Sequence, residues 1–134
     1  MLSVIYVSVA DPLIRDEDIA AILLASRRNN ARHGLTGALI YNGHNFMQLL
    51  EGPAKEVEIC LEAIRRDPRH SGLTEVRRRP VYERDFAEWS MLYDPDFEGH
   101  DEDLGRLAVR GRIDEQDEKM MHNFIALGRR RPVG

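Results

Sequence analysis

Apolar and polar residues alternate with two different periods along the first 95 positions. Two stretches repeat apolar residues every three to four positions, as amphipathic helices do. The first begins at Asp16 and has Gly34 as its end signal, and the second follows Gly52-Pro53 and ends at Asp67-Pro68. Five other stretches are apolar or alternate with a period of two, as strands do: 2–9, 35–41, 44–51, 73–81 and 89–93.

The order of these elements predicts an α+β, ferredoxin-like βαββαββ fold with two helices on one face of a mixed sheet. Asn42-Gly43 joins the second and third strands as a hairpin. Strand alternation gives both sheet faces apolar side chains, for example Val4 on one face and Ile5 on the other. Two helices cover only one face. A C-terminal helix, a second subunit or both must cover the other, and we expect both.

Residues 94–103 are acidic and read as a linker, and helical patterns follow at 104–110 and 113–127. We therefore divide the chain into a domain over residues 1–95 and a linker with a helical extension over residues 96–134. The extension is expected on the outer sheet face, where it would also contribute to a homodimer or higher homo-oligomer.

Composition narrows the functional classes. The chain has 19 Lys and Arg against 23 Asp and Glu, a net charge of −4, which disfavours a nucleic-acid partner. The single cysteine, Cys60, excludes an internal disulfide and a multi-cysteine metal site, and the five histidines lack metal-ligand spacing. No apolar run approaches the ~20 residues of a membrane span, and no secretory signal is present. We expect a soluble, cytoplasmic protein with no membrane partner.

Gln48 is the polar residue that the predicted core does not explain. It shares a strand face with Phe46 and Leu50, and an unpaired buried amide costs about 1–3 kcal/mol. Ser26 and Asn30 continue the buried stripe of the first helix, and Tyr6 faces the same layer. Together they predict a small-molecule pocket between the helices and the sheet. They form no nucleophile–base–orienter triad, so we do not expect an enzyme.

Around these residues the sequence resembles the BLUF family, the blue-light sensors that use flavin. Each matching segment is weakly diagnostic by itself, and their common order is specific. The segments cover about residues 1–95 and are 6–8, 26–30, 34–41, 46–52, 67–70 and 86–91.

The resemblance implies a flavin held non-covalently between the two helices, FAD being the expected form and FMN the alternative. Asn30 matches the asparagine that binds the polar edge of the ring, and Gln48 matches the glutamine that bridges the ring and Tyr6. Asn29 is the neighbour of Asn30, and Ser26 lies one helical turn earlier. Further matching positions near the flavin are Asp67, Arg69, His70, Trp89 and Met91.

The resemblance also implies the photochemistry. Light drives electron and proton transfer from Tyr6 by way of Gln48. The Gln48 amide is left rotated or tautomerised, its hydrogen bonding to flavin strengthens, and the absorbance shifts to the red. Separately, the two apolar sheet faces motivate the hypothesis that light shifts the C-terminal segment 104–127 and that a partner protein or the dimer reads this change.

Three other functions remain as alternatives. An RNA-binding module of this fold needs a basic sheet face with aromatic residues, and the strand beginning at His44 lacks that pattern. A BLUF-like enzyme would need its catalytic domain within residues 96–134, which are too few for a cyclase or a phosphodiesterase. A light-insensitive interaction module without flavin would not require Tyr6, Asn30 and Gln48 together.

Overall fold

The computed structural model describes residues 1–88, 90–93 and 115–121. Its helices and strands agree with the periods of the sequence, so the α+β prediction is confirmed. In chain order they are β1 Leu2–Ala10, α1 Asp16–His33, β2 Thr36–Tyr41, β3 Asn45–Gly52, α2 Ala54–Arg65 and β4 His70–Pro80.

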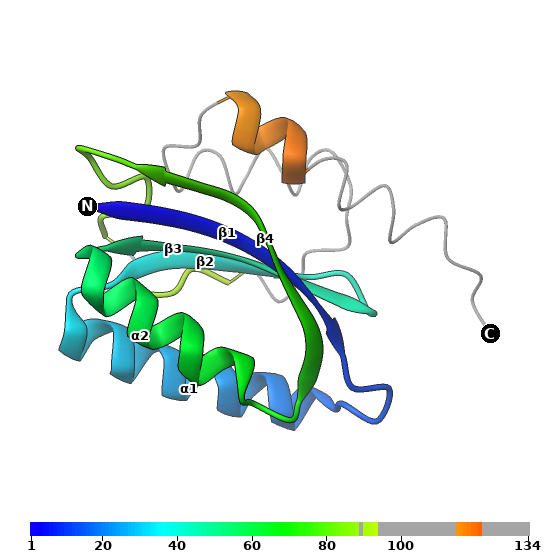
Figure 1. The fold of residues 1–134 in the computed structure, drawn as a ribbon. Helices are drawn as coiled ribbons and strands as arrows, with labels where there is room; N and C mark the ends of the chain where they lie inside the picture. The colour runs from blue at the N-terminus through cyan, green and yellow to red at the C-terminus, as the bar shows by residue number, and fades with distance from the viewer. Residues whose placement is uncertain (89, 94–114, 122–134) are drawn as a thin grey trace.

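The four strands form one sheet in the order β2-β3-β1-β4, with neighbouring strands antiparallel. The β1–α1–β2 crossover skips β3, and the β3–α2–β4 crossover skips β1. This is the split βαβ arrangement of the ferredoxin-like fold. Both helices lie on the same face of the sheet (Figure 1). The described residues therefore form two layers, with α1 and α2 packed on one face of the sheet.

Local signals explain where the helices begin and end. α1 starts at Asp16, where the sequence predicts it, and Arg15 occupies the N-cap, with its backbone N–H donating to the Asp18 carboxylate at 2.9 Å. Gly34 ends α1 with φ +68°, a left-handed conformation that glycine adopts without strain. β4 begins at His70, earlier than the predicted strand 73–81, so His70 belongs to this strand.

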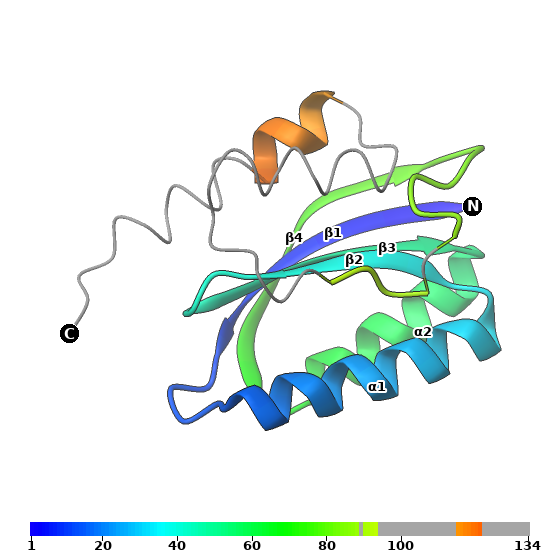
Figure 2. The ribbon, with the colours of Figure 1, turned by 180° about the vertical axis from the view of Figure 1, so that it is seen from behind.

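The fifth predicted strand, 89–93, is represented among the described residues by a single parallel bridge between Ala38 and Leu92. Leu92 N–H donates to the Gly37 carbonyl, and its carbonyl accepts from Leu39 N–H, each at 2.9 Å. The preceding carbonyls of Ser90 and Met91 are bonded by α1 side chains instead, so the ladder does not extend toward them. The segment follows the outer edge of β2 (Figure 2), and Trp89 lies outside the described residues.

Apolar side chains form a separate core on each sheet face. The helix-facing core includes Val4, Leu50 and Leu61, and the outer core includes Ile5, Met47 and Phe86. Met121 completes the outer core from a short helix at 115–121, which lies on the sheet face opposite α1 and α2 (Figures 1 and 2). The expectation that a C-terminal helix covers this face is confirmed for 115–121. The helix predicted at 104–110 and the remainder of 113–127 lie outside the described residues.

Candidate functional site

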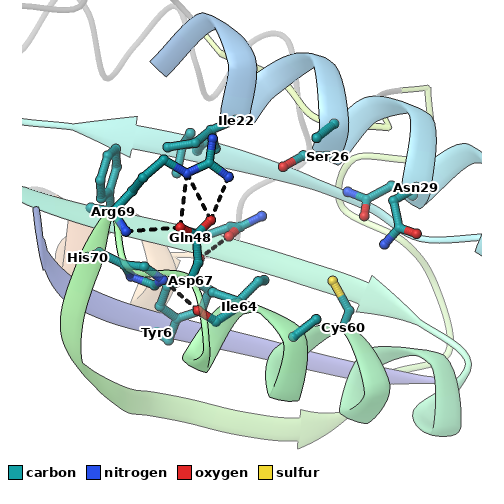
Figure 3. A pocket seen from close by; sticks show the side chains of 15 residues that line it. Tyr6, Ile22, Ser26, Asn29, Gln48, Cys60, Ile64, Asp67, Arg69 and His70 are labelled. Carbon is teal, nitrogen blue, oxygen red and sulfur yellow. Dashed lines mark hydrogen bonds and ion pairs between the residues drawn. The ribbon is translucent and has the colours of Figure 1, made fainter. Parts of the chain in front are cut away.

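A cavity of about 420 Å³ lies between α1, α2 and the helix-facing side of the sheet (Figure 3). Its volume falls within the range of roughly 300–1,000 Å³ that is usual for small-molecule sites. The walls combine apolar and polar side chains, as in such sites. The lining residues are Tyr6, Ile22, Ala25, Ser26, Asn29, Asn30, Leu39, Phe46, Gln48, Cys60, Ala63, Ile64, Asp67, Arg69 and His70.

Tyr6 and Gln48 form a buried hydrogen-bonded pair at the sheet side of the cavity. They are direct cross-strand partners in the β1–β3 register, and only 3% and 4% of their surfaces are exposed. The Tyr6 hydroxyl donates to Gln48 Oε1. Burial raises the pKa of the Tyr6 phenol well above its usual value, with smaller contributions from Cys60 and Asp67. The phenol is therefore protonated and its proton points at the Gln48 amide.

The other end of the Gln48 amide contacts Met91. Gln48 Nε2 donates to Met91 Sδ at 3.6 Å, and Met91 is buried in the helix-facing core. The Met91 carbonyl accepts a hydrogen bond from Arg27 Nε at 3.1 Å. These contacts place Met91 on the site side of its segment. Its predicted companion, Trp89, has no described position.

Asn30 ties α1 to the same segment. It is 1% exposed although it lies on a helix, and its side-chain nitrogen donates to the Ser90 carbonyl at 2.7 Å. Ser26 and Asn29 lie on the same side of α1, where Ser26 is half-buried and Asn29 is exposed at the rim (Figure 3). α1 thus lines the cavity with three polar side chains, of which Asn30 is buried, Ser26 is half-buried and Asn29 is exposed.

Asp67, Arg69 and His70 form the wall between α2 and β4. The Arg69 guanidinium donates to both Asp67 carboxylate oxygens, with Nη2 at 2.6 Å from Oδ2. This hydrogen bonding lowers the pKa of Asp67 and raises that of Arg69. His70 Nε2 lies 2.7 Å from the Ile64 carbonyl, so Nε2 donates to that oxygen, and in the neutral imidazole Nδ1 is then an acceptor. Within the described residues His70 Nδ1 is buried and has no partner.

The structure brings together eight of the ten predicted site residues in the cavity wall, and Met91 joins them through Gln48. The prediction missed the apolar walls, among them Ile22 and Ala25 on α1 and Ala63 on α2. Helical spacing from Ser26 and Asn29 was the available signal for Ile22 and Ala25. Cys60 was expected in the core of α2 and also lines the cavity. Its burial raises the thiol pKa to about 11, so the thiol is neutral near pH 7.

Among the described residues there is no group of three or more His, Cys, Asp or Glu side chains placed to hold a metal ion. Within that same part of the chain, no helix is long and apolar enough to cross a membrane.

A family model described as "Sensors of blue-light using FAD" matches residues 1–92. The chain belongs to the BLUF family. It is a domain of the blue-light flavin photoreceptors, and flavin is the cofactor of this family. The cavity fits such a group: its apolar walls suit a planar ring, Asn30 and Gln48 offer amides, and the buried His70 Nδ1 is an acceptor for a donor on the ligand.

Solved structures that resemble the chain include those of BlrB and BlrP1. The dark-state structure of BlrB, a BLUF protein, has a TM-score of 0.73 and 32% identity, and the match covers 94% of this chain and 96% of BlrB. Klebsiella pneumoniae BlrP1 with FMN and cyclic diGMP has a TM-score of 0.81 and 30% identity, over 96% of this chain and 35% of BlrP1.

Curated relatives place the BLUF domain inside longer proteins. The photoactivated adenylate cyclase subunit beta of Euglena gracilis is 37% identical over 87 residues, which is 64% of this chain and 10% of that subunit. The blue light- and temperature-regulated antirepressor BluF of Escherichia coli strain K12 is 38% identical over 66 residues, or 49% of this chain and 16% of the relative. The chain thus spans about a tenth to a sixth of the length of these relatives.

Proposed function

We propose that this BLUF domain senses blue light through the Tyr6–Gln48 pair and is not itself an enzyme. The observation that carries the proposal is the buried hydrogen bond from the Tyr6 hydroxyl to Gln48 Oε1, at the sheet side of a cavity of suitable size. A phenol is an oxidisable donor, and here its proton already points along a hydrogen bond to an amide that can both accept and donate.

A bound flavin absorbs the blue light and, once excited, supplies the oxidising power. Tyr6 would give one electron to this oxidant, and its proton would move along the hydrogen bond toward Gln48 Oε1. Both return to Tyr6, so the phenol is restored and the lasting change is in the Gln48 amide, which is rotated or tautomerised. A sulfur atom is a weak acceptor, so breaking the hydrogen bond from Gln48 Nε2 to Met91 Sδ costs little free energy.

The remaining cavity residues hold and orient the flavin. Asn30 and Gln48 bind the polar edge of the ring, because their amides in the cavity wall offer donors and acceptors. Ser26 and Asn29 act near the rim of α1. On the opposite wall, Asp67 fixes the Arg69 guanidinium with three hydrogen bonds, which keeps this wall in place while His70 offers Nδ1 to the ligand. FAD is the proposed form and FMN the alternative.

Absorbance spectra taken in the dark and just after blue light test the switch. We expect the wild-type protein to bind flavin and to show a reversible red shift. Gln48→Leu and Tyr6→Phe should retain flavin and lose the shift, since one lacks the bridging amide and the other the redox donor. Tyr41→Phe is the matched control, because it removes a phenol hydroxyl from the same sheet outside the cavity wall. A normal photocycle in either site variant contradicts the assigned roles.

The alternative function, a light-insensitive interaction module of the same fold, predicts a different result in this experiment. Its protein would be colourless and would stay colourless after addition of flavin. A coloured protein with a light-induced shift rules it out.

We further propose that the C-terminal segment 104–127 carries the signal to a partner protein or a second copy of the chain. Support comes from the helix at 115–121, whose Met121 packs in the outer core and whose Asp117 pairs with Arg77 of β4 at 2.7 Å. Hydrogen exchange of peptides covering 115–121 should differ between dark and light. Equal amide hydrogen exchange of 115–121 in the dark and in the light would contradict this part of the proposal.

A further inference from the structure

Glu51 is a buried carboxylate that the flavin site does not use. It lies three residues after Gln48 on β3, and strand alternation places the two side chains on opposite sheet faces. Its exposed fraction is 1%. A charge buried to this degree is retained only where hydrogen bonds compensate it, so its partners indicate its purpose.

Three donors converge on the Glu51 carboxylate. The backbone N–H groups of Asp85 and Phe86 donate to Oε2 and Oε1 at 2.8 and 2.7 Å, and the Thr36 hydroxyl donates to Oε1 at 2.9 Å. Two successive N–H groups directed at one anion form a nest, and such charge-assisted bonds are about twice as strong as neutral ones. Glu51 therefore fixes the backbone of the turn at 85–88 against β2 and β3.

That turn leads directly into the segment that contacts the site. The Ser90 carbonyl accepts a hydrogen bond from the Asn30 side chain, and Met91 Sδ accepts one from the Gln48 side chain. Leu92 forms a parallel bridge with Ala38 of β2. The segment is thus held at its start by Glu51 and at its end by the Leu92 bridge. The position of Met91 over the Gln48 amide depends on both anchors.

The same turn reaches the outer core. Phe86, whose N–H is bound by Glu51, is 1% exposed and packs in the cluster that contains Met121 of the helix at 115–121. One carboxylate thereby fixes a turn that contacts the photosensitive amide through Met91 and the C-terminal helix through Phe86.

We propose that Glu51 is a positioning residue of the photosensor: by binding the N–H groups of Asp85 and Phe86, it sets where Met91 lies against Gln48 and so sets the lifetime of the light-induced state. This inference rests on the proposed Tyr6–Gln48 switch. It assigns Glu51 no contact with flavin.

The test is Glu51→Gln in the full chain, with the dark spectrum, the light-induced shift and the dark-recovery rate as measurements. The side-chain amide replaces one of the two acceptor oxygens with an NH2 group, so the backbone N–H of either Asp85 or Phe86 then faces a donor. We expect flavin binding and a light-induced shift to persist, while the recovery rate changes by roughly threefold or more. Glu88→Gln is the matched control, because it makes the same chemical change at an exposed position of the same turn, and it should recover at the wild-type rate.

The positioning role is overturned if Glu51→Gln has the same spectrum and the same dark-recovery rate as the wild type. A wild-type protein without any light-induced shift would instead refute the underlying switch, so the two failures are distinguishable. If Glu51→Gln does not fold, Asp85→Pro decides the matter. It deletes one donor of the nest and leaves the carboxylate intact, and an unchanged recovery rate in that variant equally overturns the proposal.

Discussion

The side-chain nitrogen of Gln48 lies 3.6 Å from Met91 Sδ, and this contact complements the hydrogen bond that Gln48 Oε1 accepts from Tyr6. The two partners together assign the orientation of the amide, with oxygen toward the phenol and nitrogen toward the sulfur. The phenol side is a buried O–H···O bond, whereas the sulfur side is a weak acceptor. The resting amide is therefore held firmly at one end and loosely at the other.

Met91→Leu tests the weak hydrogen bond from Gln48 Nε2 to Met91 Sδ. Leucine keeps approximately the volume of methionine and removes the acceptor, so the fold and flavin binding should survive. We expect the red shift to remain and the dark-recovery rate to change by about two- to fivefold, as for loss of one weak hydrogen bond. Transient absorbance after a blue pulse measures this rate. Met47→Leu, at a buried outer-face position, is the control and should recover like the wild type.

Asn30→Ala tests the connection between α1 and the segment beyond β4. The substitution leaves the Ser90 carbonyl without its 2.7 Å partner, which should lower the free energy of unfolding by about 1–2 kcal/mol. It also removes an amide from the cavity wall, so flavin should bind roughly tenfold more weakly. Urea unfolding and flavin titration measure the two effects. Asn29→Ala, at the exposed neighbour, should have the smaller effect on stability, and an equal loss would contradict the assignment to Asn30.

Strand and helix periods were sufficient to predict the layers of the fold and most of the site. Tyr6 and Gln48 alternate with their neighbours on β1 and β3, so their shared face followed from the sequence, and the structure makes them direct partners. The helical spacing of Ser26 and Asn30 likewise placed them toward the cavity.

The segment after β4 could not be predicted in the same way, because contacts distant in sequence determine it. An apolar run at 89–93 favoured a fifth strand, but Asn30 and Arg27 bind the carbonyls of Ser90 and Met91, and only Leu92 pairs with β2. These two side-chain hydrogen bonds join residues 60 and 64 positions apart, so a local sequence pattern cannot predict them. Glu51 was missed for the same reason, since its backbone donors lie 34 and 35 positions away.

The Asp67–Arg69 pair should make stability depend on pH at the acid end. Hydrogen bonding from Arg69 lowers the pKa of Asp67, so the carboxylate is more acidic in the folded state than in the unfolded chain. The pair therefore stabilises the fold above pH ~4, and this contribution is lost as the pH falls through the folded pKa. Because Arg69 and Asp67 are partly exposed, we expect less than about 1 kcal/mol.

Asp67→Asn should accordingly lose less stability than the wild type between pH 7 and pH 3 in urea unfolding. Asp11→Asn, which neutralises an exposed carboxylate outside the cavity, is the control and should retain the wild-type pH dependence. Equal acid sensitivity of Asp67→Asn and the wild type would show that the pair does not act in this way.

Tyr6 should make stability depend on pH at the alkaline end. Burial raises the pKa of its phenol, so above pH ~10 the unfolded chain ionises Tyr6 while the folded protein does not. The stability due to Tyr6 is thus fully present below pH ~10 and declines as the pH rises further. Tyr6→Phe should flatten this decline, measured by urea unfolding between pH 9 and about pH 11. Tyr82→Phe changes a fully exposed phenol and should not flatten it.

Asp117→Asn tests what holds the C-terminal helix on the outer sheet face. Asp117 is fully buried, its Oδ1 lies 2.7 Å from Arg77 Nε, and its Oδ2 lies 3.4 Å from Arg79 Nη2. Removing one partner of a buried ion pair can cost about 3–5 kcal/mol, because the remaining charge loses its compensation. Here that cost falls on the docking of 115–121, since Arg77 and Arg79 belong to β4, which pairs with β1 along its length.

We therefore expect Asp117→Asn to exchange the amide hydrogens of 115–121 at least about tenfold faster than the wild type, as monitored by mass spectrometry in the dark. The light-induced shift should be unchanged, because Asp117 lies on the sheet face opposite the cavity. Glu118→Gln makes the same chemical change at the adjacent exposed position and should leave the exchange unaltered. Unaltered exchange in Asp117→Asn would mean that Met121 and its apolar neighbours hold the helix without the ion pair.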